Sequence, residues 1–140
     1  MKWFTHDFHI ATNGKGMYPI TEQVRDQLQS WGVRDGMCFL FIPHTSASLT
    51  MSESYDPSSR KDVEEYFEQA VPEREPWYQH TLEGADDSPS HIRTTLTQPS
   101  LSIPIDGGAL AVGTWQGIFL FEHRAHRHQR TVRLRCMDVS

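Results

Sequence analysis

The segment from His80 to His91 combines residue types that can hold a metal ion or move protons. Within twelve residues it carries two histidines, His80 and His91, and three carboxylates, Glu83, Asp86 and Asp87. It contains almost no large apolar side chain, so it contributes little to a hydrophobic core. We therefore look for a polar functional site around this segment.

A metal or acid–base site could form from this segment together with His44. Three neutral imidazoles with one open position suit zinc, whereas carboxylates and water suit magnesium. The carboxylates available to such a site are Glu53, Glu83, Asp86, Asp87 and Glu122. The spacing matches no compact metal motif such as His-Glu-x-x-His. Each histidine therefore keeps a second interpretation, as a hydrogen-bonded surface residue.

A second polar cluster lies near the C-terminal end, between two predicted strands. Arginine presents paired donors that match phosphate oxygens, so the cluster could clamp an anion, or it could be an exposed polar turn. Its members are His123, His126, His128, Arg124, Arg127 and Arg130. Serine hydrolysis is not favoured, because Ser46 and Ser48 follow His44 without a Gly-x-Ser-x-Gly elbow.

The composition limits the class of protein. The chain has 140 residues, 37% hydrophobic and 22% charged, which is typical of one globular domain spanning 1–140. No apolar run is long enough to span a membrane, and the N-terminal residues turn polar too early for a signal peptide, so we expect a cytoplasmic protein without membrane contact. The net charge of -5 argues against nucleic-acid binding. Cys38 and Cys136 are expected to be buried, reduced thiols.

The elements that must position these residues can be predicted from periodicity. Residues 2–10 alternate as a strand, and residues 20–31 repeat apolar side chains at helical spacing between Pro19 and Gly32. The continuous apolar run 37–42 predicts a central strand buried on both faces. Because His44 follows this strand directly, the core should hold it in place without enclosing it.

Two more helices are predicted around the histidine segment. Asp56 and Pro57 are typical of a helix start, and a stripe from Val63 to Val71 indicates a core-facing side, leaving the charged side to solvent. A short helix should be capped by Ser88, begin at Pro89 and run to residue 96.

The C-terminal part indicates strands joined by short turns: 101–105, 109–122 with a bulge near Gly113 and Gly117, and 132–136. Such strands pair antiparallel. The fold class expected is therefore α+β, with a mostly antiparallel sheet, two main helices and one short helix.

With these residues in place, the chain resembles the YjbQ-like family, often described as secondary thiamine-phosphate synthases. The motifs that carry the resemblance follow one another along most of the chain. They are His44-Thr45-Ser46-Ala47-Ser48-Leu49-Thr50, Asp56-Pro57, Val71-Pro72-Glu73, His80 to Ile92, Gly113-Thr114-Trp115-Gln116-Gly117-Ile118 and Glu122-His123-Arg124.

The resemblance implies a homotrimer with polar sites near subunit boundaries. It also implies a weak thiamine-phosphate synthase activity, which joins a pyrimidine pyrophosphate to a thiazole phosphate with release of pyrophosphate. Many relatives have Asn-Glu-Asn where this chain has Ser52-Glu53-Ser54, so the polar lining there should differ.

Combining motifs and chemistry, we predict three groups of site residues, of which the metal ligands form a subset of the catalytic ones. The catalytic group is His44, Ser46, His80, Asp87, His91 and Glu122; the substrate-binding group is Glu53, Gln116 and Arg124; the metal ligands, for zinc or magnesium, are His44, His80 and His91. Within the segment 80–91, His91 should face His44, with Gln116 and Glu122 alongside.

Two other functions remain open from the sequence. One is a metal-dependent hydrolase of a small phosphorylated compound, and the other is a non-catalytic homotrimer that binds metal or anions. The expected partner is a small phosphorylated molecule rather than nucleic acid or a membrane.

Overall fold

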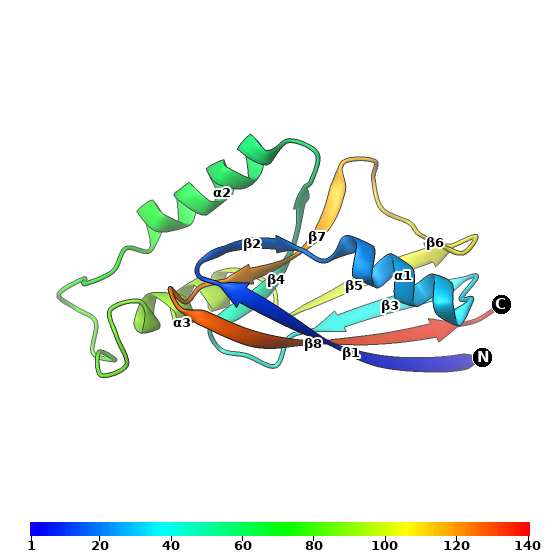
Figure 1. Ribbon diagram of the computed structural model, residues 1–140, viewed down its shortest axis with the longest axis horizontal. Helices are drawn as coiled ribbons and strands as arrows, with labels where there is room; N and C mark the ends of the chain where they lie inside the picture. The colour runs from blue at the N-terminus through cyan, green and yellow to red at the C-terminus, as the bar shows by residue number, and fades with distance from the viewer.

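The computed structural model describes all residues, 1–140, as two antiparallel sheets and three helices (Figure 1). The strands are β1 (Lys2–Asn13), β2 (Gly16–Pro19), β3 (Gly36–Phe41), β4 (Ala47–Glu53), β5 (Ser100–Asp106), β6 (Ala109–Leu110), β7 (Gln116–Glu122) and β8 (Arg127–Asp138). The helices are α1 (Thr21–Trp31), α2 (Pro57–Ala70) and α3 (Asp87–Leu96). The predicted α+β class with mostly antiparallel strands is confirmed.

The five-stranded sheet has the order β1-β8-β3-β5-β6 and the three-stranded sheet the order β2-β7-β4. One buried cluster of 17 residues draws side chains from both sheets and from α1, and a smaller cluster of Met17, Phe119 and Phe121 lies between the three-stranded sheet and α2. Cys38 and Cys136 lie opposite each other in it, on β3 and β8, as free thiols. No helix of the structure is long and apolar enough to cross a membrane.

Strand β3 is central in its sheet, but the prediction that both of its faces are buried is wrong. Cys38 and Leu40 point into the core, whereas Phe41 is 47% exposed. The other face of the sheet also carries Trp3, whose ring lies 6.4 Å from that of Phe39. The apolar run therefore reflects one core face and one open aromatic face.

Helix α1 ends as predicted, at Gly32, whose φ of 69° suits glycine and allows its N–H to donate to Leu28 and Gln29 carbonyls. Helix α2 also starts as predicted, with Asp56 accepting a hydrogen bond from the Ser58 N–H.

The predicted orientation of α2 is wrong in part. Val63 and Phe67 do pack against the three-stranded sheet, but Tyr66 is 65% exposed. On the charged side, Glu64 accepts a hydrogen bond from the Met17 N–H at 2.8 Å, and Glu68 forms ion pairs with other elements. The helix is rotated because these carboxylates have partners on β2 and α3.

Two element boundaries also differ from the prediction. Helix α3 begins at Asp87, two residues before Pro89, because proline is tolerated throughout the first helical turn. The run 109–122 is two strands rather than one: Gln116 N–H donates to the Gly113 carbonyl and closes a turn between β6 and β7.

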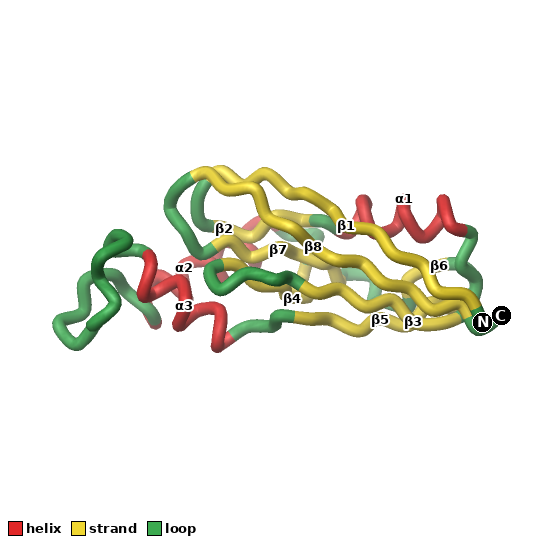
Figure 2. Tube along the Cα trace, turned by 90° about the horizontal axis from the view of Figure 1, so that it is seen from below, coloured by secondary structure: helices red, strands yellow, loops and turns green.

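The segment between α2 and α3 and the start of α3 lie at one end of the molecule. Figure 2 shows this loop and α3 beyond the strand ends, and both termini at the opposite end. The segment 80–91 is thus presented at an exposed end of the fold.

Candidate functional site

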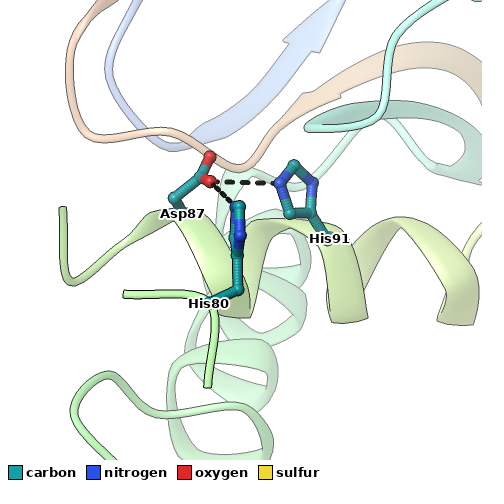
Figure 3. Close-up of side chains that lie close together, drawn as sticks. All are labelled: His80, Asp87 and His91. Atoms are coloured by element: carbon teal, nitrogen blue, oxygen red, sulfur yellow. Dashed lines mark hydrogen bonds and ion pairs between the residues drawn. The ribbon is translucent and has the colours of Figure 1, made fainter. Parts of the chain in front are cut away.

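Two histidines converge on one carboxylate oxygen at the start of α3 (Figure 3). His80 Nε2 donates to Asp87 Oδ2 at 2.5 Å, and His91 Nε2 lies 3.1 Å from the same oxygen. Asp87 and His91 are four residues apart, so they share one face of α3, while His80 approaches from the preceding loop. The local sequence Asp-x-x-x-His therefore builds half of the site by helical geometry alone.

The second ring nitrogen of His91 determines what the first can do. His91 Nδ1 lies 2.7 Å from the Thr45 carbonyl oxygen, which can only accept, so Nδ1 carries the proton. In a neutral ring, Nε2 then presents a lone pair to the Asp87 carboxylate. Two acceptors at this distance require a cation between them, which is either a second ring proton or a metal ion.

Asp87 is held as an anion although its side chain is only 2% exposed. Burial acts to raise the pKa of Asp87, but the hydrogen bond from His80 and the charges of His91 and Arg124 outweigh it and hold the pKa below its usual range. Arg124 Nη1 donates to Asp87 Oδ1 at 2.6 Å. The other oxygen remains for the two imidazoles.

The sequence predicts that Arg124 binds phosphate, but the donors of its guanidinium already form hydrogen bonds within the chain. Besides Asp87, the guanidinium donates through Nε to Asp86 Oδ2 at 2.8 Å and through Nη2 to the Glu83 carbonyl at 3.1 Å. Asp86 Oδ2 also accepts from the Ala125 N–H. Arg124 thus fastens the start of α3 to the chain that follows β7.

The group His80, Asp87 and His91 has the chemistry of a divalent metal site. One nitrogen or oxygen atom from each lies within 4.8 Å of the others. Two imidazoles and one carboxylate, with an open position for water, are a set that zinc enzymes use, whereas magnesium prefers oxygen ligands. The Thr45 carbonyl and Arg124 would orient the ligands from behind, as the outer partners in metal sites do.

His44 lies near this group but is not one of its close ligand atoms. Its Nε2 accepts a hydrogen bond from the Thr131 N–H at 2.9 Å, and burial and the charge of Arg130 lower its pKa. It lines a hollow of about 400 Å³ together with Thr45 and His91. Asp87 rather than His44 is thus the third member of the ligand group that this chain assembles.

Ser46 and Glu122 belong to a buried ion-pair network behind the group. Arg130 donates to Glu122 Oε2 at 2.5 Å and to Ser46 Oγ at 2.9 Å, and Thr12 Oγ1 donates to Glu122 Oε1. Burial acts to raise the pKa of Glu122, but these hydrogen bonds lower it. Glu122 also accepts a hydrogen bond from the Arg124 N–H, so the network fixes the backbone of the residue whose side chain contacts Asp87.

Glu53 and Gln116 lie at the far end of the same strands. They pair with each other in register, six residues from the pair formed by Ala47 and Glu122, or about 20 Å along the strand. Glu53 accepts from the Asp56 N–H and Gln116 from the Gly113 N–H, while Ser54 Oγ donates to the Trp115 carbonyl. Within a single chain, Gln116 therefore does not lie beside segment 80–91, and that expectation is wrong.

His123, predicted as part of a polar cluster that could bind an anion, is instead a buried histidine that joins α3 to the sheets. His123 is 1% exposed, and its Nε2 lies 2.8 Å from Ser48 Oγ, which accepts from Thr97 Oγ1 at the end of α3. Burial lowers the pKa of His123 to about 3, assisted by the charge of Arg93. The position of His123 directly after the apolar run of β7 was the signal that could have revealed it.

The fold and site define a class: a small antiparallel α+β protein with a His-Asp-His group at the N-terminus of a helix. The family model described as UPF0047 protein YjbQ-like matches residues 6–139. The chain belongs to this family, as the motifs predicted.

Individual relatives agree with this membership. A UPF0047 protein of Synechocystis is 47% identical over 123 residues, which is 88% of this chain and 84% of the relative. The UPF0047 protein YjbQ of Salmonella typhimurium is 40% identical over 131 residues, covering 93% and 94% of the two chains. A crystal structure of a YjbQ/UPF0047 family protein from Clostridium acetobutylicum has a TM-score of 0.86 at 32% identity, covering 94% of this chain and 99% of that chain.

Proposed function

We propose that the protein is a metal-dependent enzyme that acts on a small phosphorylated compound at His80, Asp87 and His91. The observation that carries the proposal is the convergence of three ligand atoms, one each from His80, Asp87 and His91, which lie within 4.8 Å of one another. Zinc is the ion that best suits two imidazoles and one carboxylate. A cytoplasmic location is part of the proposal.

The reaction that we propose first is a thiamine-phosphate synthase-like transfer, in which a pyrimidine pyrophosphate and a thiazole phosphate are joined. The motif resemblance supports it. Departure of pyrophosphate needs positive charge, which the bound ion would supply, while His44, which lines the same hollow as His91, would exchange protons.

Hydrolysis of a small phosphorylated compound is the second candidate. The mixed ligand set favours it, because zinc with two imidazoles and one carboxylate leaves a position at which water becomes acidic. The engagement of Arg124 with two carboxylates also leaves fewer free cations for a pyrophosphate leaving group.

The two reactions are distinguished by their products. Zinc-loaded protein is incubated with both thiamine precursors and magnesium, and thiamine phosphate and pyrophosphate are quantified; a panel of phosphate monoesters is assayed in parallel. Asp87→Asn should abolish whichever activity is found, whereas His126→Ala, an exposed histidine outside the group, should retain it. Activity that survives in Asp87→Asn, or absence of both products, contradicts the proposal.

We also propose that the active form is a homotrimer in which a neighbouring copy approaches the site. The separation of Glu53 and Gln116 from the His-Asp-His group supports this, since these motif residues can approach the group only from another chain. The non-catalytic alternative, a trimer that only stores metal, predicts a bound ion and no turnover of any substrate.

A further inference from the structure

Two hollows lie side by side along α3, next to the candidate metal ligands. The first, of about 210 Å³, is polar and includes Arg74, His80 and Ser88 in its lining. The second, of about 280 Å³, is mostly apolar and includes Trp77, Ile92 and Leu96 in its lining. Both are also lined by Glu75 and Tyr78, so they are two parts of one cleft between α3 and the loop that precedes it.

The direction of this cleft follows from helical spacing. Ser88, Ile92 and Leu96 are four residues apart and share one face of α3, with Ser88 at the polar end and Leu96 at the apolar end. Eight residues of helix span about 12 Å. The cleft therefore offers room for an elongated small molecule that lies along the helix.

The polar end suits an anionic group. Arg74 adopts a φ of 61°, a conformation that non-glycine residues rarely hold, and its side chain is 79% exposed. The N-terminus of α3 adds the positive end of the helix dipole, and Arg124, which Asp86 and Asp87 share, offsets part of their negative charge there. Glu75 at the junction of the hollows would keep a phosphate at the Arg74 and His80 end.

The apolar end suits a flat ring. Trp77 is 67% exposed and packs edge-on against Tyr78 at 4.6 Å between ring centroids. Tyr78 is held by its hydroxyl, which donates to the Pro72 carbonyl at 2.6 Å. Leu96, which lines the same hollow, is 61% exposed. A hollow lined by aromatic and aliphatic side chains is an environment in which an aromatic ring stacks favourably.

We infer that this cleft binds the substrate of the proposed function as a phosphate ester with an aromatic ring, the ring between Trp77 and Leu96 and the phosphate at Arg74 and His80. Trp77 is then a specificity-determining residue. The inference rests on the proposed function for the identity of the phosphate end, but the ring subsite can be tested without turnover.

The test compares two phosphonates that cannot be hydrolysed. 4-Phenylbutylphosphonate, which is long enough to reach both hollows, and butylphosphonate are titrated calorimetrically into zinc-loaded protein, for the wild type and for Trp77→Ala, Leu96→Ala and Trp3→Ala. The wild type should bind 4-phenylbutylphosphonate about tenfold more tightly, as one stacked ring contributes. Trp77→Ala and Leu96→Ala should remove this preference without weakening butylphosphonate, and Trp3→Ala, an exposed aromatic residue on β1, should keep it.

Equal affinity of the wild type for the two phosphonates, no binding of either, or equal losses in Trp77→Ala and Trp3→Ala would overturn the inference. The cleft could instead be filled by a second copy of this chain, which sedimentation of the same variants detects. If Trp77→Ala dissociates an oligomer, the cleft is a contact between copies. A preserved ring preference without turnover of phenyl phosphate or the thiamine precursors contradicts the proposed function and leaves the ring subsite supported.

Discussion

Asp87 joins all parts of the candidate site because its two oxygens have different partners. Oδ1 accepts from Arg124, and Oδ2 faces His80 and His91. A carboxylate that is nearly buried, ionised and flanked by two imidazoles is the arrangement expected of a metal ligand rather than of a surface acid. Asp87 and its two histidine neighbours therefore provide the chemistry of the proposed function.

We expect each chain to bind one zinc ion. Competition with a chromophoric chelator measures the zinc affinity. Asp87→Asn keeps the side-chain shape but removes the charge, and should weaken zinc affinity by more than about a hundredfold, because loss of a residue that only orients a ligand already costs about 10- to 100-fold. His126→Ala is the matched control and should bind zinc like the wild type. Unchanged zinc affinity in Asp87→Asn would refute the metal site.

The buried His123 should make stability depend on pH. Its pKa is about 3 in the folded chain and near 6.5 when unfolded, so the unfolded state binds more protons between these values. The free energy of unfolding therefore falls as the pH falls, by about 2 kcal/mol between pH 7 and pH 5. Urea titrations of His123→Gln and of the exposed control His126→Gln measure this: the dependence attributed to His123 should disappear in the first variant only.

At the scale of elements, ion pairs and hydrogen bonds attach α3 and α2 to the rest of the fold. Helix α3 is bound at its start through Arg124 and at its end through Thr97 and Ser48. Helix α2 is bound through Glu64 and Glu68. The position of both helices depends on polar contacts that helical periodicity does not reveal.

Arg124→Gln should loosen the start of α3. The substitution leaves the carboxylates of Asp86 and Asp87 nearly buried without their shared cation, and should lower the free energy of unfolding by about 3 kcal/mol. Adding Asp86→Asn to Arg124→Gln should recover part of the loss, because it removes one of the uncompensated charges. Urea unfolding of the single and double variants measures both effects.

The rotation of α2 can be tested by two substitutions on opposite sides. Glu64→Ala leaves the Met17 N–H without its acceptor and should cost about 1–2 kcal/mol. Tyr66→Ala removes a larger but exposed side chain and should change the free energy of unfolding by less than about 0.5 kcal/mol. The reverse order in thermal or urea unfolding would mean that the stripe from Val63 to Val71 faces the core after all.

At the scale of the whole molecule, the motif residues fall at two ends. The segment 80–91 belongs to the loop and helix α3 that Figure 2 shows beyond the strands, whereas Glu53 and Gln116 pair at the other end of β4 and β7, six residues from the pair Ala47 and Glu122. Exposed aromatic residues accompany each set, Trp77 near the first and the Tyr55–Trp115 pair near the second. Two different exposed patches on one chain can form a closed ring of copies.

Sedimentation equilibrium should accordingly give a mass of three chains. If Glu53 and Gln116 of one copy approach the His-Asp-His group of another, mixing Asp87→Asn with Gln116→Ala subunits should restore partial activity relative to either variant alone. A monomer with full activity would contradict the trimeric arrangement.

Local patterns in the sequence determined the elements of this protein. The α1 stripe, the Asp56 cap of α2 and the existence and central place of strand β3 each depend on residues that are close in the chain, and the structure confirms them, whereas the burial of both faces of β3 was predicted wrongly. The partnership of Asp87 with His91 also belongs to this group, because four residues in a helix fix their common face.

Only the tertiary structure decided which distant side chains meet. It brought His80 and Arg124 to Asp87, kept His44 outside the close ligand group, separated Gln116 from Glu122 along one strand, and turned the charged side of α2 towards its partners. These outcomes depend on strand register, on the path of the loop before α3 and on the pairing of buried charges. Each is set by contacts between residues far apart in the chain, which no local spacing encodes.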